Sequence, residues 1–549
     1  MNEREAIVAG FQGRSLVSLL ADNLRDHAEA PALSWPSAGG WASTTWAGYA
    51  AWVQQAAAAL VAAGVGPGDR VAVVAGNRPE HVVLDLAALT IGAVPVSVYA
   101  TLSAEQLTHV LADSGAVLAV VAGEAVRLHA EQAQVHAPGL RQLVVLDTDG
   151  PGSWATFLTD GSATVPRGEP SGLDDPATII YTSGTTGRPK GVVLTQANVL
   201  FLLGSLERVT AFPPGYVNVS YLPLAHIAER LFSHYFGLLQ HGHTYFCPDQ
   251  SELLATLTSA RPQAFLGVPR VWEKLRQGLT AALPGPVGDL PEQALAALRA
   301  RIGLDRCTFA VSGAAPMAVD VLEFWGQLGL PIHEAYGMTE TTGVTNINRP
   351  GEAVFGTVGP AIPGVEVRLL ADGEVVARGP NVMAGYLGRP EESAVDTDGW
   401  LPTGDLGVLA ADGRLRIVGR KKELIVTAGG KNIAPVAFEA ALKEHPLVGH
   451  ACLVGDRRPY LTALVVLDPD EVARRAPQGP AECDPEILAE LEALVAACNE
   501  RRARSEQVKR YAVLGQDWTP AGGELTPTLK LRRSEIHQMY AAVIDGLYR

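Results

Sequence analysis

The segment 181–191 combines the residue types that bind phosphate groups. It reads Tyr-Thr-Ser-Gly-Thr-Thr-Gly-Arg-Pro-Lys-Gly. Glycines let a backbone turn tightly and approach a phosphate closely, while hydroxyl groups and a lysine donate hydrogen bonds to phosphate oxygens. The alternative is a solvent-exposed Gly/Ser/Thr loop. A Walker P-loop does not fit, because Arg188 rather than lysine follows Gly187, and Gly191 rather than Ser or Thr follows Lys190. We therefore interpret the segment as a phosphate-binding loop on a different framework.

The elements that would position this loop read as an α/β fold. An apolar run at 177–180 predicts a strand that leads into the loop. Upstream, short apolar strands at 71–74, 94–98 and 117–121 alternate with helices at 46–63, 77–91 and 104–113, the first of these ended by glycines and the last capped by Ser103. This alternation predicts βαβ units and a parallel sheet. We expect the segments 174–181 and 191–199 to continue it.

The second half of the chain changes character. Glycine turns separate short Val-rich runs over 355–420, which predicts a small β-rich subdomain. The charged run Gly419-Arg420-Lys421-Lys422-Glu423 lies between two apolar strands. We place the main boundary there: an N-terminal domain of 1–419, a hinge of 420–422 and a C-terminal domain of 423–549. A helix near 435–443, a hairpin near 456–459 and a charged helix near 485–506 predict that the last domain is α+β.

Composition excludes several classes of protein. A chain of 549 residues exceeds what one hydrophobic core usually serves, and 47% hydrophobic residues argue against wholesale disorder. The net charge of −15 argues against broad nucleic-acid or anionic-membrane binding. Five scattered cysteines without a CxxC pair fit a reducing compartment. The N-terminus lacks the apolar core of a signal peptide and no stretch reads as a membrane span. We expect a cytoplasmic protein that could make transient contact with a membrane.

Five motifs, in order along the chain, resemble those of the adenylate-forming superfamily of acyl-CoA synthetases, adenylation domains and luciferases. Besides the phosphate loop, they are Glu334-Ala-Tyr-Gly-Met-Thr-Glu340, Asp398-Gly-Trp-Leu-Pro-Thr-Gly-Asp405, Arg420-Lys-Lys-Glu-Leu-Ile425 and Glu524-Leu-Thr-Pro-Thr-Leu-Lys530. The resemblance covers nearly the whole chain. It implies a large N-terminal domain of layered α/β subdomains with a β-rich subdomain, and a small mobile C-terminal α+β domain.

The resemblance also implies roles for individual residues. The phosphates of ATP would be held by Thr182, Ser183, Gly184, Thr185, Thr186, Gly187 and Lys190. Thr339 would contact the α-phosphate, and Glu340 with Thr182 would bind Mg²⁺, which prefers oxygen ligands. Adenine would lie between Tyr336-Gly337 and Gly313-Ala314-Ala315, while Asp405 and Arg420 would hold the ribose. Lys530 would bridge the carboxylate and the α-phosphate. Taken alone, Asp405 reads as part of a β-turn, and Lys530 as an exposed loop lysine.

Two further positions are open to two readings. His226 falls where relatives carry a residue that gates the acyl pocket, yet a structural histidine is an equal alternative. Gly430 and Lys431 belong to a loop that the resemblance assigns to coenzyme A, whereas a plain turn after a strand is the alternative. His241-Gly-His243 offers too few ligands for a metal.

Several details favour a fatty-acid substrate. The segment 268–274, Val-Pro-Arg-Val-Trp-Glu-Lys, resembles one typical of long-chain members. The segment 222–226 lacks the aspartate with which amino-acid-activating domains pair a substrate ammonium. The predicted function is an ATP- and Mg²⁺-dependent fatty acid–CoA ligase that acts through an acyl-adenylate. A ligase for aryl or short- and medium-chain acids, and a non-catalytic nucleotide-binding protein, are the alternatives. We expect small-molecule partners, no nucleic acid, and a monomer or homodimer.

Overall fold

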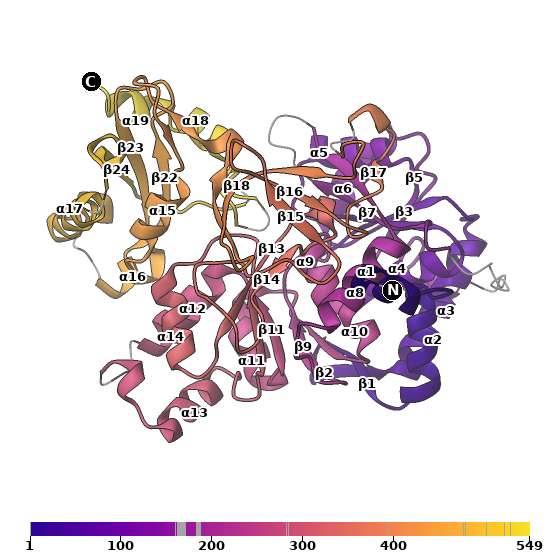
Figure 1. The fold of residues 1–549 in the computed structure, drawn as a ribbon. Coiled ribbons are helices and arrows are strands. Elements are labelled where there is room, and N and C mark those ends of the chain that lie inside the picture. The colour runs from indigo at the N-terminus through magenta and orange to yellow at the C-terminus, as the bar shows by residue number, and fades with distance from the viewer. Residues whose placement is uncertain are drawn as a thin grey trace.

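The computed structural model describes residues 2–159, 161, 172–182, 188–280, 283, 285–392, 395–475, 477, 479–500, 502–520, 522–526 and 529–549. Its N-terminal part is a layered α/β structure and its C-terminal part a smaller α+β unit, which Figure 1 shows in yellow at one end of the molecule. This is the fold class that the sequence predicts.

The largest sheet has seven strands in the order β17-β8-β7-β4-β3-β5-β6. Its strands are β3 (Arg70–Val74), β4 (Val94–Val98), β5 (Ala116–Val121), β6 (Gln142–Val145), β7 (Pro176–Thr182), β8 (Lys190–Thr195) and β17 (Gly385–Tyr386). The helices between them are α4 (Pro79–Thr90), α5 (Ala104–Ser114), α6 (Glu124–Gln134) and α7 (Trp154–Thr159), preceded by α1 (Glu3–Gly10), α2 (Leu16–His27) and α3 (Trp46–Ala62). Strands β4, β3, β5 and β6 pair in parallel, and Ser103 caps α5 as predicted.

One part of this sheet departs from the predicted pattern. Strand β8 pairs antiparallel with β7, because the short connection between them can close a hairpin but cannot hold a crossover helix. The strand ends at Thr195, whose side chain accepts a hydrogen bond from the Asn198 backbone N–H and starts α8 (Gln196–Glu207). The segment 191–199 therefore continues the alternation of strand and helix, but its strand is antiparallel to β7 rather than parallel.

Two four-stranded sheets complete the α/β layers. The first, in the order β2-β1-β10-β9, contains β1 (Pro31–Ser37), β2 (Gly40–Thr45), β9 (Val217–Ser220) and β10 (His243–Phe246), with α9 (Ile227–Glu229) and α10 (Phe236–Leu239) between the last two. The second, in the order β11-β12-β13-β14, contains β11 (Ala264–Gly267), β12 (Phe309–Ser312), β13 (Ile332–Tyr336) and β14 (Asn346–Ile347), with α11 (Leu253–Ala260), α12 (Pro269–Thr280), α13 (Glu292–Arg301) and α14 (Val319–Gln327).

The predicted β-rich subdomain is an antiparallel sheet of β15 (Glu366–Leu369), β16 (Glu374–Arg378), β18 (Leu401–Leu409) and β19 (Leu415–Arg420). After β19 a single helical turn, 421–423, leads into the C-terminal unit. That unit contains β20 (Ile425–Val426), β21 (Asn432–Ile433), α15 (Val436–Lys443), β22 (Val448–Val454), β23 (Leu461–Leu467), α16 (Pro469–Arg475), α17 (Pro485–Glu500), β24 (Val508–Leu514), α18 (Arg533–Met539) and α19 (Ala541–Gly546).

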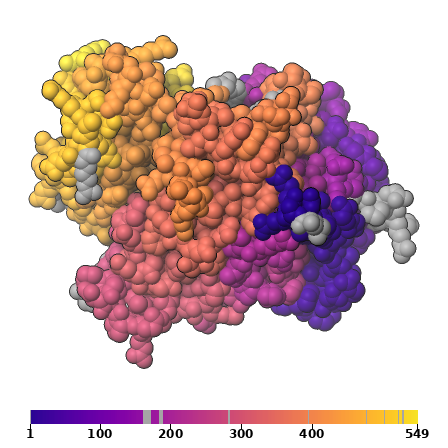
Figure 2. Space-filling view, viewed as in Figure 1, coloured from indigo at the N-terminus to yellow at the C-terminus, as the bar shows by residue number. Residues whose placement is uncertain are grey.

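The C-terminal unit has its own hydrophobic cores. Two apolar clusters are built from residues of 425–544, on the two faces of the β22-β23-β24 sheet. Figure 2 shows this unit in contact with the remainder of the molecule along one side. The boundary at 420–422 stays a prediction, and the separate cores support it. None of the helices in the described ranges is both long and apolar enough to cross a membrane.

Candidate functional site

A large cleft of about 2510 Å³ lies between the N-terminal part and the C-terminal unit. It is lined by most of the residues that the sequence singles out: Thr182, Lys190, His226, Gly313, Ala314, Ala315, Tyr336, Gly337, Thr339, Glu340, Asp405, Arg420 and Lys530. The phosphate-loop residues Ser183, Gly184, Thr185, Thr186 and Gly187 lie outside the described residues. The ends of the strands on either side of that loop, Thr182 and Lys190, face each other across the β7–β8 hairpin.

Strand ends form the wall predicted for adenine. The parallel strands β12 and β13 bring Gly313-Ala314-Ala315 beside Tyr336-Gly337. Ala314 has a positive φ of 70°, a strained conformation for a residue with a Cβ. A Cβ on Gly337 would lie 2.3 Å from the carbonyl oxygen of Gly343, so this position requires glycine. The backbone of this wall is therefore tightly constrained.

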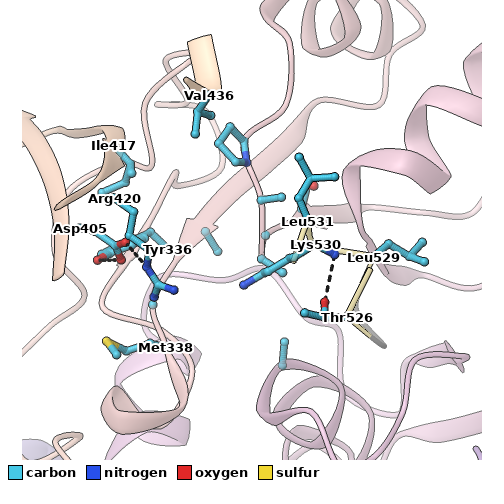
Figure 3. A pocket seen from close by; sticks show the side chains of 18 of the residues that line it. Tyr336, Met338, Asp405, Ile417, Arg420, Val436, Thr526, Leu529, Lys530 and Leu531 are labelled. Carbon is cyan, nitrogen blue, oxygen red and sulfur yellow. Dashed lines mark hydrogen bonds and ion pairs between the residues drawn. The ribbon is translucent and has the colours of Figure 1, made fainter. Parts of the chain in front are cut away.

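Asp405 accepts hydrogen bonds from two neighbouring side chains of the cleft. Its carboxylate accepts a hydrogen bond of 2.8 Å from the Tyr336 hydroxyl and one of 3.0 Å from Arg420 Nε (Figure 3). Arg420 lies directly across the β18–β19 ladder from Asp405. Burial and the adjacent Asp405 raise the pKa of Tyr336, so its hydroxyl stays a donor. This hydrogen-bond network fixes the Asp405 carboxylate at the cleft wall, which the interpretation of Asp405 as part of a plain β-turn does not explain.

Glu340 is a buried carboxylate at the floor of the cleft. It lies in the short turn 339–341, and one of its oxygens accepts a hydrogen bond of 3.1 Å from the Tyr386 hydroxyl. Burial raises its pKa, and among the described residues no cation forms an ion pair with it. A buried carboxylate without a cationic partner fits a ligand of a hard divalent cation. Thr182, the other predicted Mg²⁺ ligand, also lines the cleft, and the described residues contain no group of three His, Cys, Asp or Glu side chains that could hold a metal ion.

Lys190 faces the same region. Its ammonium forms an ion pair with Glu392 and lies 5.2 Å from the centre of the Tyr386 ring. Sequence analysis missed Tyr386 and Glu392, which enter the cleft because β17 pairs with β8. Strand β17 has only two residues and carries no periodic pattern, so no local signal in the sequence marked either residue.

Lys530 projects from the C-terminal unit into the cleft. Figure 3 shows it opposite Arg420, Asp405 and Tyr336, with its backbone N–H donating to Thr526 Oγ1 at 3.0 Å. The Lys530 side chain remains in contact with solvent inside the cleft. The protein atoms that surround the cleft partly desolvate the ammonium, and this desolvation, together with the charge of Arg420, lowers the pKa of Lys530. The two halves of the chain therefore meet with Lys530 at the candidate nucleotide site.

His226 lies at the cleft beside Lys530. Its Nδ1 accepts a hydrogen bond from the Ala228 backbone N–H at 3.2 Å, and burial plus the charge of Lys530 lower its pKa to about 3. The imidazole is therefore neutral near pH 7. It is both a helix cap and a wall residue, so the gating and structural interpretations both stay open.

Gly430 and Lys431 do not line the cleft in this arrangement. Lys431 forms an ion pair of 2.8 Å with Glu506 inside the C-terminal unit. Their predicted contact with coenzyme A would need another orientation of that unit.

The chain belongs to the AMP-binding enzyme family, whose model matches residues 20–387, while that of the AMP-binding enzyme C-terminal domain matches residues 422–549. The fold and the cleft are thus those of an adenylate-forming enzyme. Among its relatives, the long-chain-fatty-acid–CoA ligase FadD15 of Mycobacterium bovis is 35% identical over 93% of both chains. The adenylation domain of a carboxylate reductase from Mycobacterium chelonae shares the fold, with a TM-score of 0.84, 23% identity and coverage of 99% and 93%. An ATP-bound RpMatB-BxBclM chimera has a TM-score of 0.77, 27% identity and coverage of 96% and 98%.

Proposed function

We propose that this protein is an ATP-dependent long-chain fatty acid–CoA ligase. It would join a fatty-acid carboxylate to ATP to give an acyl-adenylate and pyrophosphate, and then transfer the acyl group to the thiol of coenzyme A with release of AMP. The observation that carries the proposal is that Lys530 meets Asp405, Arg420 and Glu340 in one cleft. The relative FadD15 supports the substrate class.

The cleft has both polar and apolar walls, as this reaction requires. Beyond His226 it is lined by Leu231, Phe232, Phe236, Phe309 and Val321. An acyl chain would gain free energy from burial there, at about 0.8 kcal/mol per methylene. All five side chains are apolar, so this part of the wall favours an alkyl chain over a charged group.

The polar residues would each act on the ATP molecule. The carboxylate must attack an α-phosphate that is itself anionic, so oriented cations lower the barrier. Lys190 would hold the outer phosphates, Asp405 the ribose and Lys530 the oxygens between the carboxylate and the α-phosphate. Bound Mg²⁺, held by Glu340, would neutralise phosphate charge. After adenylation, rotation about 420–422 would withdraw Lys530 and bring Gly430 and Lys431 to the acyl-adenylate.

An acid panel tests the proposal directly. Pyrophosphate release is measured with acetate, octanoate, palmitate and benzoate, with and without coenzyme A, and products are identified by mass. Palmitoyl-CoA as the preferred product supports the proposal. Preference for benzoate or the short acids would favour the alternative ligase, and no pyrophosphate from any acid would favour a non-catalytic nucleotide-binding protein.

Substitution of Asp405 by alanine should weaken ATP binding. Loss of charge-assisted hydrogen bonds to the ribose would raise KM for ATP by about 10- to 100-fold with a smaller change in kcat. Steady-state kinetics over a range of ATP concentrations measures this. Asp412→Asn is the control, because Asp412 pairs with Arg414 in an exposed turn of the same sheet. An unchanged KM would remove the ribose role of Asp405.

The lowered pKa of Lys530 predicts an alkaline limit to adenylation. Only the protonated amine can stabilise the phosphate charge, so kcat/KM for adenylation should fall as pH rises through a pKa below 10.5. Lys530→Arg should lose this limb, because a guanidinium stays charged at such pH. The pH profiles of the two proteins, taken by pyrophosphate exchange, check this; the same limb in both would assign it to another group.

A further inference from the structure

Among the described residues, three ion pairs join helix α12 of the N-terminal part to the C-terminal unit. Arg270 pairs with Asp468, Lys274 Nζ lies 3.0 Å from an oxygen of Asp470, and Lys443 Nζ lies 3.7 Å from an oxygen of Glu273. Figure 1 shows α12 directly beside α16, the helix that follows Asp468. The α12 residues of these pairs all belong to the segment 268–274, which resembles one typical of long-chain members. The candidate nucleotide site gives this segment no role.

The pair of Arg270 and Asp468 is the most enclosed of the three. The side chain of Asp468 is 1% exposed and that of Arg270 is 17% exposed. The other oxygen of Asp468 accepts the backbone N–H groups of Asp470 and Glu471 at 3.0 and 3.1 Å, which caps α16. Burial alone would raise the pKa of Asp468, yet Arg270 and the hydrogen bond from the Glu471 backbone lower it. The hydrogen bonds thus fix the position of the Asp468 carboxylate, and the charge of Arg270 offsets the cost of burying its negative charge.

Helix α12 is a firm support for these contacts. Trp272 is fully buried, donates through its indole N–H to the Gly267 carbonyl at 2.9 Å, and packs edge-on against Trp325 at 5.0 Å. Positions 270, 273 and 274 share one face of the helix at i, i+3 and i+4 spacing, away from Trp272. The helix therefore buries its aromatic side in the N-terminal part and presents its charges to the C-terminal unit.

We propose that Arg270, assisted by Glu273 and Lys274, is a positioning residue for adenylation: it holds the C-terminal unit in the orientation that places Lys530 in the cleft. The inference rests on the proposed two-step function. All three pairs cross between the two units, so each must break when the C-terminal unit rotates for the second step. The adenylation step gains from the pairs, and the thioester step does not.

The two half-reactions separate this role from a structural one. Adenylation is measured by ATP–pyrophosphate exchange with palmitate, and the second step by palmitoyl-CoA formation from supplied palmitoyl-AMP. Because Arg270→Met leaves the enclosed carboxylate of Asp468 without its cation, it should slow the first step by about tenfold, with the second step unchanged or faster. Asp468→Asn, which keeps an oxygen for the cap, should behave alike, and the double variant should be no slower than the slower single variant.

Two further variants complete the design. Arg299→Met is the matched control, because Arg299 is 16% exposed and pairs with Glu292 inside the N-terminal part; it should change neither step. Lys274→Glu should slow adenylation modestly, and added Asp470→Lys should restore it, since both side chains are at least half exposed.

Each result decides the question. Equal slowing of both half-reactions, additive effects of Arg270→Met and Asp468→Asn, or adenylation at the wild-type rate in Arg270→Met would overturn the positioning role. If Arg270→Met lowers the melting temperature, the Lys274→Glu and Asp470→Lys pair decides instead, and absence of rescue overturns the role. Failure of the proposed function looks different, because wild-type protein would then form no palmitoyl-CoA.

Discussion

Lys530→Ala is expected to abolish acyl-adenylate formation while the protein still converts supplied acyl-AMP to acyl-CoA. In the structure Lys530 lies opposite Asp405 and Arg420, where a bound α-phosphate would develop additional charge. Loss of one oriented donor to a transition state typically costs about 10²- to 10³-fold in rate. The second step would proceed with the C-terminal unit rotated away, so it would not depend on this amine.

Pyrophosphate exchange with palmitate and thioester formation from palmitoyl-AMP measure the two steps. Lys509→Ala is a suitable control, because Lys509 belongs to the same unit and donates a hydrogen bond of 2.7 Å to the nearby Gln507. Lys530→Arg should recover part of the adenylation rate, since it restores the positive charge with a different shape. Equal loss of both steps in Lys530→Ala would contradict the assignment.

Glu340→Gln is expected to reduce adenylation by at least about 10²-fold and yet to raise the stability of the folded protein. The raised pKa of Glu340 shows that its charge is costly in the fold. With a folded pKa above the unfolded value, this carboxyl destabilises the protein as pH rises above the unfolded pKa of 4.5. Glutamine keeps the acceptor oxygen for Tyr386 but removes that charge. The carboxylate would thus be retained for cation binding at the expense of stability.

Denaturant unfolding at pH 5 and pH 8 measures the stability difference, which should be larger at pH 8. A magnesium titration of pyrophosphate exchange measures the functional loss and should show a weaker dependence in the variant. Tyr386→Phe is the comparison, because it removes only the hydrogen bond to Glu340 and should reduce activity far less. Wild-type magnesium dependence in Glu340→Gln would show that another group holds the cation.

The two predictions share one physical theme. Lys530 and Glu340 both carry charges in an enclosed cleft. The pKa of Lys530 is lowered and that of Glu340 is raised, so both shifts favour the neutral form of the side chain. In a protein without ATP these charges lack the partners that would compensate them. Bound ATP would supply negative charge beside Lys530, and bound Mg²⁺ positive charge beside Glu340. Substrate binding should therefore stabilise the closed arrangement of the two units.

Much of the fold follows from local patterns. The helices at 46–62 and 79–90 and the strands at 70–74 and 94–98 begin and end within a residue or two of their predicted bounds, because periodicity and capping act over a few residues. The motifs around Glu340, Asp405 and Lys530 were also found in the sequence alone. Their meeting in one cleft agrees with the resemblance, while their individual roles stay predictions.

Other features depended on contacts between distant residues. The antiparallel pairing of β8 and the approach of Tyr386 to Glu340, 46 positions away, arise from sheet pairing that no short pattern encodes. The sequence by itself determined which chemical groups the protein carries, because residue types and their spacing are local. Only the tertiary structure decided that Arg270 meets Asp468 across 198 positions and that Lys530 enters the cleft, because these depend on the orientation of two separately packed units.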